Sequence, residues 1–323
     1  MFENTLKLYD NLFAIEQHAE KLVKLEVLDN ISLEYLTEHW ANGIDSLFQA
    51  LPEVEGCYLV KNEDQAWSKL AGQVPILTPF INQVLYQQQF YQLPLHWHKH
   101  NLSSHYPQRL IQSIKQVRLH PQRPPKPTGE VYSRFDCLVG KQISFRTFDL
   151  EKDINRFTDW MNDPRVAEFW EQAWSQEKLE EFIAERQNDS HIIPLIGEFD
   201  GYPFGYFEVY WVTEDRLAPY YDNEPYDRGI HLLVGEQAFR GPLFFKSWMR
   251  ALTHYLFIDE QRTQRVVLEP RHDNQRLFCR IKDVGYRILF EFDFPHKTSA
   301  LVMVEREAFF RQQFVVQMEA QSP

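Results

Sequence analysis

The chain has 323 residues and a mass of 38.7 kDa, and its 44% hydrophobic and 25% charged content excludes a fibrous repeat or a disordered chain. It carries 34 Lys and Arg against 46 Asp and Glu, a formal net charge of -12, which disfavours nucleic acid as a partner. No apolar run approaches the roughly 18 residues that a membrane-spanning helix needs. The N-terminus also lacks the features of a secretory signal, so we expect a cytoplasmic protein without membrane contact.

The three cysteines, Cys57, Cys137 and Cys279, are widely spaced and odd in number. A disulfide framework or a Cys-rich zinc site needs paired or closely spaced cysteines, so neither is expected. We expect buried thiols instead.

A histidine-rich stretch, HWHKHNLSSH, contains His96, His98, His100 and His105. Spacings of two and five residues could in principle bring such side chains together at a metal ion. No Cys, Asp or Glu within the stretch completes a ligand set, however. We therefore expect a solvated histidine cluster and no metal site.

Residues 120–130, HPQRPPKPTGE, form the clearest boundary in the chain. Four prolines there remove backbone donors and hold the chain extended, which predicts a linker. It would separate an N-terminal mixed α/β domain, residues 1–119, from a second domain, residues 131–323. The spacing of apolar residues predicts three elements in the first domain: helices at Asn11–Leu28 and Leu33–Leu51, and a strand at Gly56–Val60.

The second domain shows a regular succession of patterns. Asp200-Gly201, the dipeptide most favoured in a tight hairpin, separates two apolar segments that should pair antiparallel. Periodicity predicts strands at 143–148, 192–199, 202–212, 229–235, 265–270, 288–294 and 299–306, and helices at 150–163, 175–188, 239–257 and 274–286.

This order of elements, from about Lys141 to Arg311, resembles the GNAT acyltransferase superfamily. The resemblance implies an α/β (α+β) fold class, with a mixed, largely antiparallel sheet flanked by helices. The smaller N-terminal domain could be a diverged, non-catalytic copy of a similar fold.

The segment around Arg240 and Gly241 leads from a strand into a helix, whose N-terminus presents unpaired N–H groups and a positive dipole end to a phosphate. In the superfamily this place holds the pyrophosphate of coenzyme A. Arg240 and Gly241 match the family pattern, whereas Pro242 has no N–H, and Leu243 and Phe245 replace small residues. The pyrophosphate cradle must therefore differ in detail, and a helix start without a ligand is the alternative.

Three longer blocks are more specific: GIHLLVGEQAFRGP, HYLFIDEQRTQRVVLEPRHDN and EFDFPHK. Together they resemble the siderophore-biosynthesis branch of the superfamily, the hydroxylysine acetyltransferases of aerobactin-type pathways and related N-hydroxydiamine acyltransferases. The resemblance implies acyl transfer from acetyl-CoA or succinyl-CoA to the hydroxylated nitrogen of N6-hydroxylysine, N-hydroxyputrescine or N-hydroxycadaverine. The product would be a hydroxamate, the reaction needs no metal, and other enzymes of the siderophore pathway are possible partners.

His231 lies on the strand that precedes Arg240 and Gly241, and histidine is the side chain best able to accept a proton near pH 7. Asp273 follows the next strand and would converge on the same cleft, where it could orient His231 or bind the hydroxyl group of the substrate. The resemblance assigns the same two catalytic roles. Cys279 is a weaker alternative as an acylated nucleophile, because its apolar neighbours favour a buried thiol.

For the acyl-CoA we expect backbone groups of Leu232, Leu233 and Val234 at the thioester and pantetheine, with Arg240, Gly241 and Asn274 nearer the phosphates. Asn274 could equally be only a helix N-cap. Further cations that could meet the phosphates are Lys246, Arg250 and Arg276. The expected acceptor side offers an acid and aromatic walls, which could also be simple core: Trp170, Glu208, Tyr210 and Trp211.

Two alternatives remain for the function. An acetyltransferase of another polycationic amine, such as an aminoglycoside, would also use an acidic, aromatic cleft. A non-catalytic scaffold would follow if the altered glycine motif no longer binds coenzyme A.

Overall fold

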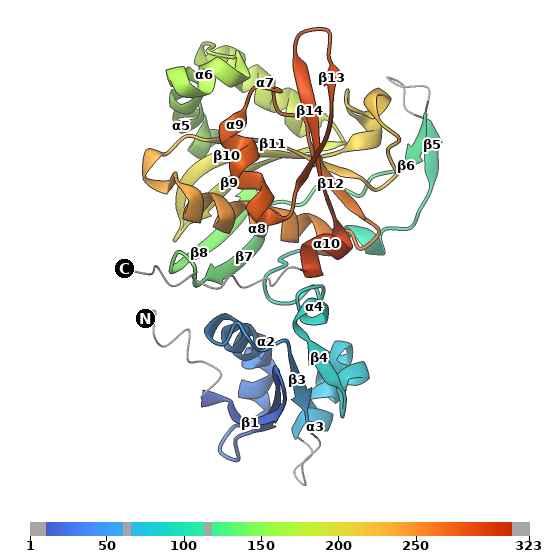
Figure 1. Cartoon of the computed structure of the whole chain (residues 1–323). Coiled ribbons are helices and arrows are strands. Elements are labelled where there is room, and N and C mark those ends of the chain that lie inside the picture. The colour runs from blue at the N-terminus through green and yellow to red at the C-terminus, as the bar shows by residue number, and fades with distance from the viewer. Residues whose placement is uncertain (1–10, 61–65, 113–117, 312–323) are drawn as a thin grey trace. The chain divides into compact units, whose positions relative to one another are not determined.

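A computed structural model of the chain describes residues 11–60, 66–112 and 118–311. The chain divides into two compact units (Figure 1). Unit 1 is made of residues 1–96 and 310–323, and unit 2 of residues 97–309. No helix in these described ranges has both the length and the apolar composition needed to cross a membrane.

Unit 1 has a four-stranded sheet in the order β1-β2-β3-β4, with antiparallel, parallel and antiparallel pairings. The helix predicted at Asn11–Leu28 is wrong, because this segment forms the β1–β2 hairpin. Along β2 the buried residues Val23, Leu25 and Val27 alternate with half-buried ones, which is a period of two. The predicted second helix is confirmed as α2. The elements are β1 Phe13–Ala19, β2 Leu22–Val27, α2 Leu33–Ala50, β3 Gly56–Leu59, α3 Ala66–Gln73, β4 Val84–Tyr86 and α4 Gln87–Phe90.

Unit 2 contains an eight-stranded sheet in the order β13-β14-β12-β11-β10-β9-β8-β7. Only β11 and β12 pair in parallel among these strands, so the predicted mixed, largely antiparallel sheet with helices is confirmed. The elements are β5 Leu110–Gln112, β6 Leu119–Pro121, β7 Glu130–Asp136, β8 Lys141–Thr147, α5 Leu150–Asn162, α6 Pro164–Trp170, α7 Gln176–Asn188, β9 Ile192–Phe199, β10 Tyr202–Trp211, β11 Arg228–Val234, α8 Pro242–Asp259, β12 Arg265–Leu268, α9 Gln275–Ile281, β13 Arg287–Asp293, β14 Thr298–Glu305 and α10 Arg306–Arg311.

The two units share a succession of elements. In unit 1 an antiparallel hairpin leads through α2 to a strand that pairs in parallel with the second hairpin strand. In unit 2 the β10–β11 pair leads through α8 to β12 in the same way, and both helices have 18 residues. This order agrees with a diverged copy, which stays a prediction.

The boundary between the units falls between His96 and Trp97, earlier than the proline-rich segment. Residues 120–130 are therefore not an interdomain linker but lie inside unit 2. One reason is Arg123, whose buried guanidinium donates to the carboxylate of Glu214 at 2.5 and 2.7 Å and lies 4.2 Å from the ring centre of Trp211.

The histidine stretch is also anchored in unit 2, so the expected solvated cluster is wrong for two of its members. The Nε2 atoms of His98 and His100 each lie 3.3 Å from Oδ1 of Asp259, and the side chain of His98 is only 3% exposed. Ser103 and Arg228 hold the other oxygen of Asp259. The carboxylate comes from α8, about 160 residues further along the chain, where the stretch itself gives no sign of it. The two histidines and Asp259 place their ligand atoms within 4.8 Å of one another.

The sheet opens at its centre, and this opening positions the site. β11 and β12 pair only at Arg228 with Val266 and at Gly229 with Val267. Beyond these pairs the strands diverge, so the rest of β11 faces a gap instead of a neighbouring strand. Along β10 the side chains of Tyr206 and Glu208 lie on the sheet face that α5 to α7 cover, whereas Phe207 packs against Trp248 of α8 on the other face.

Candidate active site

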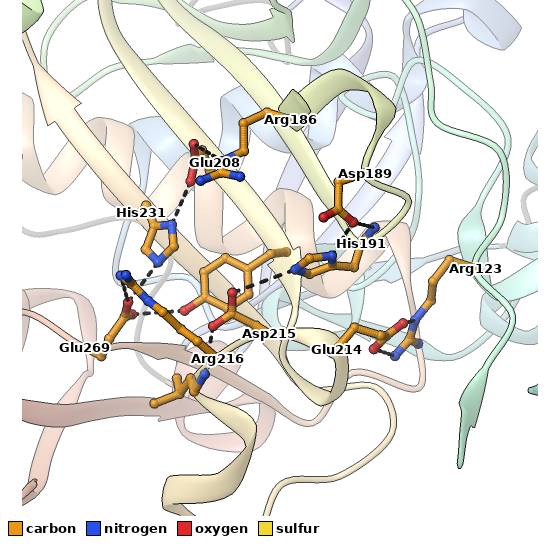
Figure 2. A network of polar contacts seen from close by, with 12 residues as sticks. Arg123, Arg186, Asp189, His191, Glu208, Glu214, Asp215, Arg216, His231 and Glu269 are labelled. Atoms are coloured by element: carbon orange, nitrogen blue, oxygen red, sulfur yellow. Dashed lines mark hydrogen bonds and ion pairs between the residues drawn. The ribbon is translucent and has the colours of Figure 1, made fainter. Parts of the chain in front are cut away.

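The centre of the site is a histidine held between two carboxylates (Figure 2). Nδ1 of His231 lies 2.7 Å from Oε2 of Glu208, and Nε2 lies 2.8 Å from Oε1 of Glu269. Glu208 is the cross-strand neighbour of His231 on β10, and Glu269 directly follows β12. The side chains of both glutamates are 2% exposed, whereas that of His231 is 19% exposed. The ring is therefore the part of this triad most open to a reactant.

The charges of the triad fix its protonation. Burial alone would lower the pKa of His231, but the charge of Glu269 and the hydrogen bonds to both carboxylates outweigh burial and raise that pKa to about 10. Burial would likewise raise the pKa of Glu208 and of Glu269, but the interaction with His231 holds both below their usual value. At neutral pH the triad is an imidazolium between two carboxylates, and each ring N–H donates to one of them.

A second layer of side chains fixes the two glutamates. Tyr206 donates to Glu208 at 2.9 Å, and Arg186 pairs with the same carboxylate at 3.2 Å. Tyr210 donates to Glu269 at 2.9 Å, and its ring lies 4.6 Å from that of His231. Every oxygen of the two carboxylates thus has a partner.

Gly229 allows this arrangement. It lies opposite Tyr210 in the β10–β11 pair, and a Cβ at position 229 would come within 2.0 to 2.5 Å of the Tyr210 ring and hydroxyl. Only glycine leaves room for the ring that supports Glu269.

His231 opens into a cavity of about 520 Å³ on the sheet face covered by α6 and α7. Its walls combine aromatic and charged groups, including Phe169, Trp170, Arg186, Arg216, His296 and Lys297. A volume of this size suits a small molecule.

A second cavity, of about 450 Å³, adjoins the first and lies along the opened edge of β11. The two cavities share wall residues, Phe169, Trp170, Leu232, Asn274 and Leu277. Two reactants that occupied them together would meet at this shared wall, beside His231.

Four arginines line the second cavity: Arg165, Arg240, Arg276 and Arg280. Burial, followed by the positive charges of the other three arginines, lowers the pKa of Arg240. Asp163 pairs with Arg165 at 2.5 Å and offsets part of this charge. Like charges gathered in this way favour an anionic ligand such as a phosphate chain.

The N-terminus of α8 borders the same cavity. Gly241 is the N-cap and has a φ of 116°, a conformation that favours glycine, and Pro242 is the first helical residue. The first intrahelical bond runs from the Phe245 amide to the Gly241 carbonyl. The amides of Leu243 and Phe244 precede that bond, so they are the helix-end donors that the missing N–H of Pro242 leaves.

The structure brings most of the predicted residues to the two cavities. His231, Glu208 and Trp170 line the first cavity, and Tyr210 contacts it indirectly, through its hydrogen bond to Glu269. Those along the second are Trp170, Leu232, Leu233, Val234, Arg240, Gly241, Asp273, Asn274 and the further cation Arg276. Asn274 also caps α9 by accepting a hydrogen bond from the Leu277 amide, so both readings of this residue find support.

Several residues are placed differently from the prediction. Asp273 does not contact His231; its carboxylate pairs with Arg271 at 2.6 Å and is 49% exposed. Trp211 lies on the other face of β10, where it stacks with Arg123 and Arg228, because neighbours along a strand point to opposite faces. Cys279 is exposed rather than buried, since Phe278 and Ile281 carry the buried face of α9.

The residue that sequence reasoning missed is Glu269. It lies in the EPRHDN block, where Asp273 drew attention instead. Its position follows from the register that the structure shows: continuing the parallel pairs 228–266 and 229–267 by two residues places Glu269 beside His231. Arg165 and Arg280 were also missed, because neither stands near the glycine turn in sequence.

An arginine-lined cavity along the opened strand adjoins the cavity at His231, and two adjoining cavities of this kind are typical of an enzyme of group transfer. The model of the acetyltransferase (GNAT) domain matches residues 149–294. The N(6)-hydroxylysine O-acetyltransferase of Escherichia coli is 43% identical over 272 residues, which are 83% of this chain and 84% of that protein.

Two further proteins extend the comparison. The N(5)-hydroxyornithine:cis-anhydromevalonyl coenzyme A-N(5)-transacylase of Beauveria bassiana is 39% identical over 200 residues, 61% of this chain but only 44% of that protein. An uncharacterized protein of Bacillus halodurans, known from its crystal structure, has a TM-score of 0.55 and 28% identity, and covers 58% of this chain and 96% of its own.

The chain belongs to the GNAT acetyltransferase family, in the group that contains the hydroxylysine enzyme of Escherichia coli. It is an acyltransferase that takes its acyl group from an acyl-CoA. The resemblance found in the sequence is thereby confirmed.

Proposed function

We propose that this enzyme acylates the hydroxylated nitrogen of a small amine and so forms a hydroxamate for siderophore biosynthesis. The relatives at 43% and 39% identity are named for hydroxylysine and hydroxyornithine, which supports an N-hydroxylated acceptor. The observation that carries the proposal is the Glu208–His231–Glu269 triad, which lines the first cavity next to Leu232 of the wall shared with the second.

The acyl-CoA would lie in the arginine-lined cavity with its thioester at the shared wall. Arg165, Arg240, Arg276 and Arg280 suit the phosphates, and the amides that begin α8 add donors. Backbone groups of Leu232 to Val234, on the opened part of β11, would hold the pantetheine and the thioester oxygen. The acceptor would enter the other cavity, with its hydroxylated nitrogen toward His231.

The reaction needs modest proton transfer. An N-alkylhydroxylamine is largely neutral at pH 7, so its nitrogen can attack the thioester carbonyl directly. Once the C–N bond forms, the nitrogen becomes strongly acidic and its proton must leave, while the thiolate of coenzyme A departs from the carbonyl carbon. A positioned proton acceptor contributes roughly 10² to 10⁴ in rate to such a step.

We assign the proton acceptor to Glu269, which His231 holds in position. Because the ring already holds a proton on each nitrogen at neutral pH, it cannot take another. The carboxylate of Glu269 lines the cavity and receives the proton. The imidazolium of His231, 2.8 Å away, holds this carboxylate in position. Asp273, whose exposed carboxylate pairs with Arg271, takes no part in this proton transfer.

The experiment measures thiol release from acetyl-CoA and succinyl-CoA with N6-hydroxylysine, N-hydroxyputrescine and their unhydroxylated parents. Wild type should turn over only hydroxylated acceptors, and His231→Ala should lose that turnover. Equal turnover of the plain amines would instead assign the enzyme to general amine acetylation.

A second readout identifies the atom that is acylated, because the name of the Escherichia coli relative specifies O-acetyl transfer. A hydroxamate gives a coloured ferric complex at once, whereas an O-acylated hydroxylamine does not. We expect ferric colour to rise in step with thiol release. A colourless product would show transfer to oxygen and contradict the proposal.

A further inference from the structure

Lys297 lines the cavity at His231, which we assign to the acceptor, and the acyl-transfer chemistry gives this side chain no role. It follows β13 in the turn before β14, and its Nζ donates to the main-chain carbonyl of Glu269 at 3.1 Å. Its side chain is half-buried and lies 5.6 Å from the ring centre of Phe294. The ammonium group is thereby held against the main chain of Glu269, whose side chain contacts His231.

Lys297 forms no ion pair with the carboxylates that line the cavity. The three arginines of the lining each pair with a carboxylate: Arg186 with Glu208, Arg216 with Glu269 and Arg271 with Asp273. Among the described residues, Lys297 has no carboxylate within ion-pair distance and donates only to the carbonyl. Unlike the three arginines of this cavity, Lys297 is therefore able to form an ion pair with a ligand.

The acids of the lining do not change this conclusion. Glu208 and Glu269 are engaged with His231 and the arginines, Glu214 with Arg123, and both Asp189 and Asp215 with His191. Glu171 also lines the cavity; its exposed side chain raises the pKa of Lys297 through its charge but does not form an ion pair with it. Burial lowers the pKa of Lys297, and the charges of Arg216 and Arg271 add to this, whereas those of Glu269 and Glu171 oppose it. Lys297 thus lies beside Arg216 in a part of the cavity where its ammonium is the cation that has no ion pair among the described residues.

We propose that Lys297, with Arg216 beside it, is a subsite for the carboxylate of an amino-acid acceptor. This inference rests on the proposed function. Both the Lys297 ammonium and His231 contact Glu269, one through its carbonyl and the other through its carboxylate. A carboxylate bound at Lys297 and a hydroxylated nitrogen at His231 would therefore lie on the two sides of one residue, Glu269, and the four methylenes of N6-hydroxylysine would join them. A diamine acceptor would bring only a second positive charge to this subsite.

The test compares two acceptors that differ only in the carboxylate. N-hydroxycadaverine is N6-hydroxylysine without its carboxyl group, so their kcat/KM ratio isolates the subsite. We expect wild type to favour N6-hydroxylysine by tenfold or more, since an ionic hydrogen bond has about that effect. Lys297→Met should lower kcat/KM for N6-hydroxylysine about tenfold and change that for N-hydroxycadaverine less than about twofold, whereas Lys297→Arg should keep most of the preference.

The control is Lys282→Met, which removes an exposed lysine outside both cavities and should leave the ratio unchanged. Equal losses for both acceptors in Lys297→Met would overturn the proposal, because Lys297 would then act through Glu269 alone. A loss seen only with succinyl-CoA would also overturn it and assign the carboxylate to the acyl donor. If wild type uses neither hydroxylated acceptor, the proposed function itself fails, which is a distinct result.

Discussion

His231 and Glu269 are 38 residues apart in the sequence, yet a ring nitrogen of one lies 2.8 Å from a carboxylate oxygen of the other. Their contact follows from the register of β11 and β12, which pair at 228–266 and 229–267 before they diverge. Two residues further along each strand, the backbones have parted and a side-chain bridge spans the opening.

Glu269 should matter much more for catalysis than Asp273. Glu269→Gln keeps the shape of the side chain but removes the charge that holds the His231 imidazolium, so kcat should fall by roughly 10² to 10³. Asp273→Asn removes an exposed carboxylate and should change kcat less than about threefold. Thiol-release assays on both variants, with a thermal melt to check folding, measure the contrast. Comparable losses in the two would return Asp273 to the catalytic centre.

The pH profile distinguishes the charged pair from a free histidine base. The pKa of His231 is raised to about 10, so the ring is charged over the neutral range. If the imidazolium supports Glu269, kcat should be level from about pH 7.5 to 9 and fall as pH rises through about 10. A free histidine base would give the opposite limb, a rate that climbs toward pH 10.

The raised pKa of His231 also determines how the stability of the fold changes with pH. Because the folded-state pKa exceeds the ordinary value of 6.5, the triad stabilises the fold fully below about pH 6.5 and loses that contribution as pH rises through about 10. Urea unfolding at pH 7 and pH 10 should therefore show the difference in unfolding free energy between wild type and Glu269→Gln shrinking at the higher pH. A difference that grows with pH would contradict the charged triad.

The arginine-lined cavity should recognise the phosphates of the donor. Arg276→Gln and Arg280→Gln are each expected to raise KM for acetyl-CoA about three- to tenfold and to leave KM for acetyl-pantetheine, which lacks the phosphates, nearly unchanged. Arg287→Gln removes an exposed arginine outside both cavities and is the matched control. Equal increases for both donors would show that these arginines do not contact phosphate.

Gly229→Ala should damage both stability and activity. The added methyl would overlap the Tyr210 ring, so we expect an unfolding free energy lower by about 1–3 kcal/mol. The displaced ring would also release Glu269 and lower kcat. Gly72→Ala, in α3, meets no atom within 4 Å and should be neutral or slightly stabilising. Chemical unfolding of both variants tests this, and an unchanged Gly229→Ala protein would contradict the packing described.

The sequence predicted the order of elements in unit 2 because that order depends on local patterns. Asp200 and Gly201 both have positive φ at the turn of the β9–β10 hairpin, as the dipeptide indicated. The hairpin of unit 1 was missed because apolar residues in a short segment fit a helix and a strand alike, and its turn at Lys21, with a φ of 60°, has no glycine. The helix predicted at 150–163 ends as expected just before Pro164, but this proline also begins a further helix, α6.

The candidate site was predicted in part for a related reason. His231 and Glu208 were both identified, but not their contact, because recognising cross-strand neighbours requires the register of the β10–β11 pair. Asp273 was preferred to Glu269 because position after a strand does not tell which acid faces the gap. His98 and His100 lacked a partner in the stretch because Asp259 reaches them from a distant helix.

The divergence of β11 from β12 also limits which substitutions the active site tolerates. Where the backbone ladder ends, the bond between His231 and Glu269 joins the two strands in its place, so one contact serves both the chemistry and the cohesion of the sheet. A substitution that retunes the proton transfer therefore also weakens the join between the two halves of the sheet. Variation in acceptor preference is then easier at positions such as Lys297, which line the cavity but do not bridge the strands.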